Sequence, residues 1–325
     1  MILILNKKDL EELLTMDEVL SALEIGFREL KEGRCIVPVR FHLGIEQYQG
    51  QFLFMPAFLS GLKQSGTKIV SVFPQNISKG KPTLFATYLL SDPTTGELLA
   101  LIEGGTLTGI RTGGTSALAT RYLARNDSKV LGVIGTGFQA SFQVKAIRAV
   151  RPIEEVWAYD IDSKRLENFC KGLTHFVSVH SAESPSEVVK KSDILVTSTT
   201  SNTPVFSGKN LKPGTHINAI GAFRPDMRET DDETILQSTV VVDTYEGCLN
   251  EAGDLLIPMK EGKFKKESIH GDLGEVITGR KQGRRSPEEI TLFKSVGFAM
   301  EDVVVAHRAY EKAIREGKGK QIEIS

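Results

Sequence analysis

The first residues of the chain show two hydrophobic patterns. Residues 2–5 are continuously apolar, which is typical of a short strand. The next stretch, TMDEVLSALEIGFRELKEG, has an apolar stripe at helical spacing, formed by Leu20, Leu23, Phe27 and Leu30. Thr15 and Glu18 form a capping box at its start, and Gly33 stands at its end. The pattern predicts an amphipathic helix between Thr15 and Gly33.

Short β-rich runs dominate the region from Val37 to Leu101. The runs QFLFMPAF, TKIVSVF and TLFATYLLS are separated by glycine, proline and the turn DPTTG. This alternation predicts a β-meander with helices on one side. The segment LTGIRTGGTSALATRYLARND, residues 107–127, then carries Leu118, Tyr122 and several alanines at helical spacing, which predicts a helix.

Beyond Val130 the pattern changes to alternating strands and helices. Apolar runs predict strands at residues 130–134, 154–160, 175–181, 193–199, 215–221 and 239–244. Helices are expected at residues 138–150 and around 185–192. Near-continuous apolar strands that alternate with helices are typical of a parallel sheet covered on both faces. The fold class expected here is therefore α/β, with a doubly wound parallel sheet.

Composition and charge narrow the classes of function. The chain has 325 residues, enough for about two domains, and 40 basic residues balance 41 acidic ones. This balance does not favour nucleic acid or an anionic membrane as a partner and suits small neutral or zwitterionic ligands better. The apolar start MILIL is too short for a signal peptide and lacks a basic leading region, which favours the cytoplasm. No metal-ligand spacing stands out, and the three cysteines are expected to be reduced.

A glycine-rich turn follows the predicted strand at residues 130–134. Gly135, Gly137 and Ala140 fit G-x-G-x-x-A between a strand and a helix, where the first glycine allows the tight turn and the second lets a pyrophosphate approach the backbone. The helix amino terminus then faces the phosphates. Asp160 ends the next strand at the distance expected for the acid that binds the adenosine ribose. Together these residues predict a dinucleotide site.

Asp160 also favours NAD over NADP, because a carboxylate repels a 2′-phosphate. Lys164 and Arg165 follow closely and can offset that repulsion, so NADP stays possible. The alternative is that Asp162 or Ser163 caps a helix on which both cations are solvated.

In this fold, ligands bind beyond the carboxyl ends of the strands. Thr199, Thr200 and Ser201 follow one strand and offer hydroxyls to ribose or phosphate, or satisfy a turn. Gly221 and Ala222 follow the next strand and are small enough for the nicotinamide ring to approach. The expected cofactor-binding set is Thr112, Gly135, Thr136, Gly137, Phe138, Gln139, Ala140, Asp160, Thr199, Thr200, Ser201, Gly221 and Ala222.

Several motifs give the chain a resemblance to a known family. PVRFHLG, FLFMPAF, GTKIVSVFPQN, TGIRTGGTSALA, GVIGTGFQA, INAIGAFRPDMRE, EAGDLLIP and GDLGEVITG resemble the ornithine cyclodeaminase and mu-crystallin family over nearly the whole chain. The resemblance implies a Rossmann domain, residues 115–302, inserted into a second α+β domain, residues 1–114 plus 303–325. In the family this second domain binds substrate and forms a homodimer.

The resemblance also assigns roles to three cations. Arg40 in PVRF, Lys68 in GTKIV and Arg111 in GIRTGG match the basic residues with which family members hold a substrate carboxylate. An arginine fork binds a carboxylate through two parallel hydrogen bonds, and a lysine adds a compact charge. Lys68 stands inside an apolar run, where a lysine without a structural partner is costly.

Departures from the family pattern distinguish its branches. The cyclodeaminases, and the alanine dehydrogenases with them, carry an aspartate two residues before the proline of RPDMRE, where this chain has Phe223. The segment RPDMRE otherwise resembles the mu-crystallin type, which includes ketimine reductases. Asp226 is the candidate for a nearby acid, although a surface turn after Pro225 explains it equally well. His216 begins a buried strand and is expected to be structural, whereas His42 lies near the proposed carboxylate site.

The sequence therefore predicts an NAD(P)H-dependent reductase of a cyclic α-imino acid. Its substrate is expected to be Δ1-pyrroline-2-carboxylate or the six-membered homologue, reduced to L-proline or L-pipecolate. Lys68 and Asp226 are the candidate catalytic residues, and Arg40, Lys68 and Arg111 are the candidate substrate-binding residues. Three alternatives stay open: an ornithine cyclodeaminase, an alanine dehydrogenase and a non-enzymatic ligand-binding protein of the mu-crystallin kind.

Overall fold

The computed structural model describes residues 1–323 and divides the chain into two compact units. The first unit comprises Met1–Arg111 and the chain from Phe298 onward, and the second unit comprises Thr112–Gly297. The chain therefore changes unit at 111/112 and at 297/298, whereas the sequence analysis expected 114/115 and 302/303. No helix among residues 1–323 is both long and apolar enough to cross a bilayer.

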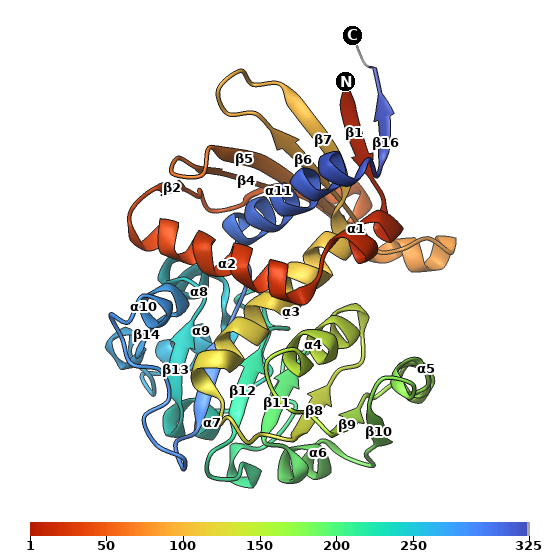
Figure 1. Cartoon of the computed structure of the whole chain (residues 1–325). Coiled ribbons are helices and arrows are strands. Elements are labelled where there is room, and N and C mark those ends of the chain that lie inside the picture. Colours follow the sequence, from red (N-terminus) through yellow and green to blue (C-terminus); the bar gives the residue numbers. More distant parts are fainter. Residues whose placement is uncertain (324–325) are drawn as a thin grey trace. The chain divides into compact units, whose positions relative to one another are not determined.

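An eight-stranded sheet forms the base of the first unit (Figure 1). Its strands are β1 (Ile2–Leu5), β2 (Cys35–Ile36), β3 (Phe41–Ile45), β4 (Gly50–Leu59), β5 (Gln64–Val72), β6 (Leu84–Ser91), β7 (Leu98–Glu103) and β16 (Lys320–Ile322). Strands β4 to β7 pair antiparallel in sequence order, so the predicted meander is confirmed. Strand β1 adds to β7 in parallel and pairs with β16 on its other side, which joins the two ends of the unit.

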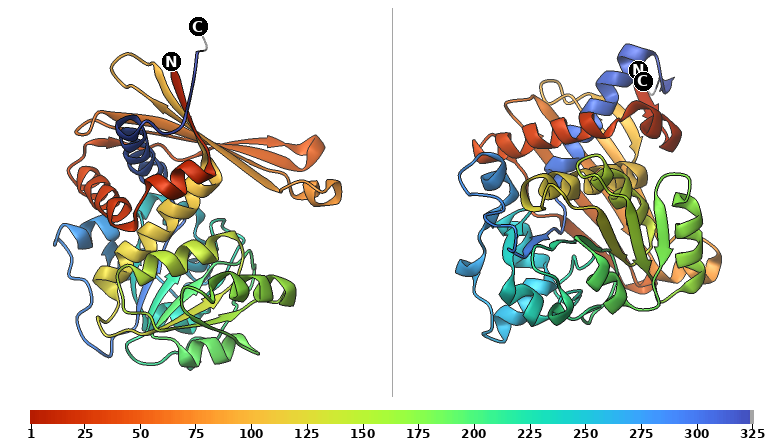
Figure 2. Two further views of the ribbon diagram at one scale, coloured as in Figure 1. Left: turned by 45° about the vertical axis from the view of Figure 1, so that its right-hand side comes forward. Right: turned by 60° about the horizontal axis from the view of Figure 1, so that its bottom comes forward.

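Two long helices, α2 (Met16–Lys31) and α11 (Ala299–Glu316), pack against each other, and α11 lies on the sheet of the first unit (Figures 1 and 2). The capping box of Thr15 and Glu18 is present at the start of α2, as the sequence predicts. A Cβ on Gly26 would lie 2.3 Å from the sulfur of Met300, so this glycine permits the close approach of the two helices. The remaining helical segments of the unit are α1 (Lys7–Leu13), η1 (Glu46–Tyr48) and η2 (Pro74–Lys79).

Helix α3 (Gly104–Leu123) connects the two units along the chain and starts earlier than its pattern predicts. The Glu103 carboxylate accepts hydrogen bonds from the backbone N–H groups of Gly105 and Thr106, at 2.7 and 2.8 Å. This carboxylate satisfies the free donors of the first turn, which is why the helix begins before Leu107.

A second sheet of eight parallel strands forms the second unit. The strands are β8 (Val130–Ile134), β9 (Glu155–Tyr159), β10 (Ser178–Ser181), β11 (Ile194–Thr197), β12 (His216–Ala219), β13 (Thr239–Val242), β14 (Gly271–Asp272) and β15 (Thr291–Lys294). Their order is β10-β9-β8-β11-β12-β15-β13-β14, so the strand order reverses next to β8. Every strand expected from the sequence is present. The sequence analysis missed β14 and β15, which are short and lie beyond the clear strand–helix alternation.

Helices cover both faces of this sheet, as the doubly wound prediction requires (Figure 1). They are α4 (Phe138–Arg148), α5 (Ser163–Leu173), α6 (Pro185–Lys191), α7 (Asp232–Gln237), α8 (Tyr245–Glu251), α9 (Gly253–Lys260) and α10 (Leu273–Ile277), with η3 (Gly208–Asn210) and η4 (Lys266–Ser268). Val133 packs in one core with α4 and α5, while its neighbour Ile134 packs in the other with α6 to α9. Alternate residues of a strand thus supply opposite faces.

Buried polar side chains also join these strands. His216 is fully buried, and its ring Nδ1 lies 2.9 Å from the Thr291 hydroxyl on the neighbouring strand. Burial lowers the pKa of His216 to about 3, so the ring is neutral at physiological pH. The predicted structural role of His216 is confirmed. Cys35, Cys170 and Cys248 are free thiols, as expected.

Candidate functional site

The glycine-rich turn lies between β8 and α4 in the second unit. Gly135 has φ of +90°, and a Cβ on it would lie 2.8 Å from the Ser198 carbonyl oxygen. Only glycine fits both the backbone angle and the space. A Cβ on Gly137 would meet no atom within 4 Å, and Ala140 is fully buried against the sheet. The turn therefore leaves open space at its second glycine.

The amino terminus of α4 is not capped by any side chain. The first N–H groups of a helix carry partial positive charge and bind anions when no side chain occupies them. Gln139, in this first turn, has a buried side-chain oxygen without a hydrogen-bond partner among the described residues. Phe138 beside it is 60% exposed. The uncapped start of α4 fits the pyrophosphate of a dinucleotide, the group that the sequence predicts at this turn.

Asp160 is buried at the end of β9, and its carboxylate accepts hydrogen bonds from the glycine-rich turn. Its Oδ2 accepts hydrogen bonds from the backbone N–H and the hydroxyl of Thr136, at 2.7 and 2.9 Å. Its Oδ1 accepts from the backbone N–H of Asp162. A carboxylate has about four acceptor positions, so a ribose hydroxyl can still bind. Asp162 accepts from the backbone N–H of Arg165 and caps α5, so the predicted cap is present. A terminal nitrogen of Arg165 lies 3.8 Å from Asp160 Oδ2, so this cation stays near the carboxylate that it was expected to offset.

The Glu229 carboxylate accepts hydrogen bonds from both loops that follow β11 and β12. The sequence analysis did not identify this residue. Its Oε1 accepts from the backbone N–H and the hydroxyl of Thr199 at 2.6 and 2.9 Å, and its Oε2 accepts from the backbone N–H of Gly221 at 2.7 Å. Further bonds reach Oε2 from the Thr197 hydroxyl and the Ala222 N–H, at 3.0 and 3.2 Å. One buried carboxylate thus fixes both loops expected to border the nicotinamide.

This carboxylate also changes the interpretation of two predicted residues. A Cβ on Gly221 would lie 2.4 Å from the Glu229 carboxylate, so the small size of Gly221 serves the approach of Glu229. The Thr199 hydroxyl donates to Glu229 and accepts from the backbone N–H of Ser201, and the Ser201 hydroxyl donates to the Thr203 carbonyl. Thr200 is the exposed member of the three.

Asp254 and Lys294 extend the network away from these loops. Asp254 Oδ1 accepts from the backbone N–H groups of Glu229 and Thr230, at 2.7 and 2.8 Å. Lys294 Nζ lies 2.8 Å from Asp254 Oδ2, and both side chains are fully buried. Burial and the charge of Asp254 raise the pKa of Glu229, and Lys294 opposes them. The motifs RPDMRE and EAGDLLIP therefore meet in one ionic network.

Glu229→Gln is expected to weaken NADH binding about tenfold. The amide NH₂ would face backbone donors that it cannot satisfy, and each buried unsatisfied donor costs about 1–3 kcal/mol, so the loops at Thr199 and Gly221 should shift. Titration of NADH fluorescence measures the affinity. Glu233→Gln, on the exposed side of α7, is the matched control. Unchanged NADH affinity in Glu229→Gln would contradict this role.

In the first unit, two of the three predicted cations lie together around a carboxylate. Lys68 on β5 places its Nζ 2.9 and 2.8 Å from the two Asp302 carboxylate oxygens, and 3.3 Å from the Thr108 hydroxyl. Arg111 on α3 donates from Nε to Asp302 at 3.0 Å, and from a terminal nitrogen to Glu301. Lys68, Arg111, Glu301 and Asp302 are all buried. We call these four residues the buried ionic cluster.

The cluster shifts the pKa of its members. Burial and the charge of Arg111 lower the pKa of Lys68 to about 8, although Asp302 acts in the opposite direction. Arg40 also lowers this pKa, which brings the third predicted cation within electrostatic range of Lys68. For Arg111, burial lowers the pKa, but Asp302 and Glu301 outweigh it and raise the pKa. Lys68 is therefore a buried ammonium that can release its proton near neutral pH.

The sequence analysis missed Glu301 and Asp302. Their helix is separated from Lys68 and Arg111 by the whole second unit along the chain, so no local spacing relates them. The available signal was the pair of acids at the start of a predominantly apolar helix, where the helix dipole favours negative charge.

The remaining candidates lie elsewhere in their units. Asp226 is exposed and accepts two hydrogen bonds from the Arg224 side chain, at 3.1 and 3.0 Å. This arrangement agrees with the alternative that Asp226 belongs to a surface turn. Phe223 is 38% exposed. His42 lies exposed on β3, with its Nδ1 3.4 Å from the Gln51 side-chain oxygen. Thr112 follows Arg111 on α3 and is partly exposed.

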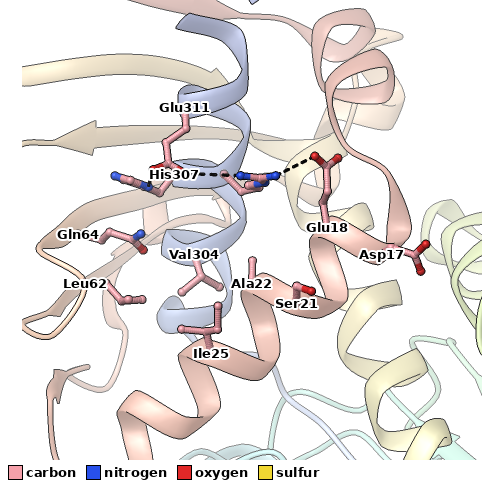
Figure 3. A pocket seen from close by; sticks show the side chains of 11 residues that line it. Asp17, Glu18, Ser21, Ala22, Ile25, Leu62, Gln64, Val304, His307 and Glu311 are labelled. Carbon is pink, nitrogen blue, oxygen red and sulfur yellow. Dashed lines mark hydrogen bonds and ion pairs between the residues drawn. The ribbon is translucent and has the colours of Figure 1, made fainter. Parts of the chain in front are cut away.

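A surface groove of about 380 Å³ lies between α2 and α11 in the first unit (Figure 3). Ala22, Ile25 and Val304 line its apolar floor, and Glu18 and His307 stand at its sides. None of the residues expected from the sequence to bind substrate or cofactor lines it. The groove is therefore separate from the buried ionic cluster.

Comparison with known proteins agrees with this geometry. The model of the ornithine cyclodeaminase/mu-crystallin family matches residues 2–317. A Δ1-pyrroline-2-carboxylate reductase of Bacillus cereus is 43% identical over 324 residues, which cover 99% of each chain. The Thermococcus litoralis Δ1-pyrroline-2-carboxylate reductase, solved with NADH and L-proline, has 44% identity and a TM-score of 0.95 over 99% of this chain and 100% of that one.

An archaeal alanine dehydrogenase dimer with bound NAD is also similar, with 38% identity and a TM-score of 0.92 over 100% of this chain and 99% of that one. The two-unit architecture, the glycine-rich turn and these matches along the full length agree with one another. The chain belongs to the ornithine cyclodeaminase/mu-crystallin family.

Proposed function

We propose that this protein reduces a cyclic α-imino acid, Δ1-pyrroline-2-carboxylate or its six-membered homologue, to L-proline or L-pipecolate with NADH. The observation that carries the proposal is the buried ionic cluster, in a chain whose B. cereus and T. litoralis relatives reduce this imine. The protein is accordingly an oxidoreductase that acts on a C=N bond.

The charges near the cluster suit a substrate with a carboxylate. Lys68 and Arg111 are buried cations, and Arg40 lies within electrostatic range of Lys68. Asp302 and Glu301 hold Lys68 and Arg111 in place, so a substrate carboxylate would meet cations that are already oriented.

Each cation has an assigned task. Arg111 and Arg40 orient the substrate carboxylate, because an arginine fork fixes both its position and its angle. Reduction adds one hydride to the carbon and one proton to the nitrogen of the C=N bond. We assign the proton to Lys68, whose Nζ–H bond breaks as the nitrogen accepts it, leaving a neutral amine. Asp226 is the alternative acid.

The turn from Gly135 to Ala140 and the uncapped start of α4 would hold the pyrophosphate, and Asp160 would accept from the ribose. Glu229 keeps the loops at Thr199 and Gly221 in place. NADH, when bound, supplies the hydride, and the protein supplies orientation and electrostatics.

Asp160→Ser is expected to move cofactor preference toward NADPH by about tenfold or more, equivalent to about 1.4 kcal/mol, since the repulsive carboxylate is removed. Specificity constants for NADH and NADPH measure the ratio. Affinity for NADH should also fall, because serine cannot replace both bonds to Thr136. Asp162→Ser keeps a helix cap and is the control. If the ratio of the specificity constants for NADH and NADPH is unchanged in Asp160→Ser, Asp160 does not bind the adenosine ribose.

A substrate panel tests the proposed function. Δ1-pyrroline-2-carboxylate, the six-membered imine and pyruvate with ammonia are assayed with NADH, and L-ornithine with NAD⁺, by nicotinamide absorbance and ammonia release. We expect oxidation of NADH with the cyclic imines and no ammonia from ornithine, because Phe223 replaces the aspartate of the cyclodeaminases. Efficient turnover of pyruvate with ammonia would instead favour an alanine dehydrogenase. Binding without turnover would favour a ligand-binding protein.

We also propose that the protein is a cytoplasmic homodimer that pairs through its first unit. This unit exposes apolar side chains on the strands of its sheet, among them Phe41 on β3 at 61% and Phe85 on β6 at 50%. Exposed apolar patches of this kind mark interfaces. Light scattering coupled to gel filtration should give twice the chain mass, and Phe41→Glu should lower it to that of a monomer. A monomer in the unmodified protein would contradict the pairing.

A further inference from the structure

We propose that Asp302 is the positioning residue of this site: its carboxylate bridges Lys68 and Arg111 and holds both cations ready for the substrate. The inference deepens the proposed function and rests on it. It adds a residue that neither touches the imine nor carries a proton to it, and that acts through two residues that do.

The geometry of the bridge is specific to Asp302. One carboxylate oxygen accepts from Lys68 Nζ at 2.9 Å and from Arg111 Nε at 3.0 Å, and the other lies 2.8 Å from the same Nζ. The three side chains come from β5, α3 and α11. Asp302 is thus the point at which the sheet and both helices set the distance between the two cations.

Burial makes this bridge necessary. Lys68 is 2% exposed and Asp302 is 0% exposed, so water cannot screen the repulsion between Lys68 and Arg111. Both acids stand in the first turn of α11, where the helix dipole stabilises negative charge. Glu301 fixes the outer end of the Arg111 guanidinium. Asp302 contacts both cations.

Asp302 also controls the proton on Lys68. The charged and titratable groups around Lys68 are Arg111 on α3, Arg40 after β2, Asp302 on α11 and, beside Asp302, Tyr88 on β6. The two arginines lower the pKa of Lys68, and the Asp302 carboxylate raises it. Because the protonated lysine is the active form, activity should fall as pH rises through the pKa of Lys68. Removal of the Asp302 charge should move that fall to lower pH.

The test is Asp302→Asn, a change that keeps shape and removes charge. We expect the alkaline limb of the kcat/KM profile to move at least about one pH unit lower and the KM for Δ1-pyrroline-2-carboxylate to rise about tenfold or more. NADH affinity should stay near that of the unmodified protein. Glu301→Gln is the matched control: it removes a buried charge that pairs with Arg111 and not with Lys68 Nζ in the bonds described above, so it should raise KM and move the limb by much less than Asp302→Asn.

A loss of activity without a shift of the limb would mean that Asp302 is merely structural, and would overturn the proposal. An unchanged KM and an unchanged limb would overturn it as well. If Asp302→Asn fails to fold, Thr108→Val removes the hydroxyl 3.3 Å from Lys68 Nζ and should move the limb in the same direction by less. No shift in Thr108→Val would then count against control of Lys68 by its acceptors.

The failure of the proposed function is distinguishable from the failure of this inference. Assay of the unmodified protein with the substrate panel shows whether the proposed function is correct. Asp302 is tested without turnover by NMR titration of ¹³C-labelled lysine, with the Lys68 signal assigned by Lys68→Met. A Lys68 pKa that is the same in the unmodified protein and in Asp302→Asn overturns the inference, whatever the substrate is.

Discussion

Arg111→Ala is expected to lower kcat/KM for Δ1-pyrroline-2-carboxylate by about a thousandfold or more. Loss of a charged hydrogen-bond partner costs roughly 1.5–3 kcal/mol, and a misplaced imine carbon loses about a further hundredfold. The variant should still bind NADH. Steady-state kinetics with the imine, and fluorescence titration with NADH, measure the two effects separately.

Arg111→Ala also leaves Glu301 and Asp302 with one fewer cation, so part of the loss of activity can come from a less stable folded protein. Breaking one partner out of a buried ion pair costs about 3–5 kcal/mol. Arg111→Lys separates these effects, because it restores a positive charge to both acids but cannot form the fork. We expect Arg111→Lys to regain stability in thermal unfolding but little activity. Near-normal turnover in Arg111→Ala would contradict the assignment of Arg111.

Lys294→Met is expected to destabilise the second unit by about 3–5 kcal/mol. Methionine matches the length of lysine, so packing is kept, but the fully buried Asp254 loses the ammonium 2.8 Å away. Glu229, whose pKa burial and Asp254 already raise, also loses a compensating charge. Urea unfolding followed by circular dichroism measures the free energy of unfolding.

The destabilisation by Lys294→Met should depend on pH. Without the ammonium, the pKa of Glu229, which burial already raises, rises further above its unfolded value, so stability is lost as pH rises through the unfolded pKa. The difference in the free energy of unfolding between Lys294→Met and the unmodified protein should therefore be smaller at pH 5 than at pH 8. Lys265→Met, at an exposed position, should stay within about 0.5 kcal/mol. A pH-independent loss would indicate a packing defect instead.

The sequence by itself determined many of the elements and the dinucleotide turn, because local rules fix them. The capping box at Thr15, the antiparallel meander and the strand–turn–helix around Gly135 depend on residues close together in the chain. Periodicity and the backbone angle of one glycine are sufficient for such features. The resemblance of TGIRTGGTSALA to a family added the role of Arg111, which spacing alone does not supply.

Only the tertiary structure decided which charges meet. Asp302 reaches Lys68, and Lys294 reaches Asp254, across segments that no sequence pattern relates. Thr199 and Gly221 likewise show ordinary loop chemistry in the sequence, until Glu229 is found to accept hydrogen bonds from both. The reason is physical, because a buried charge is stable only when it is paired. The sequence around a charged residue does not say which distant element supplies the partner.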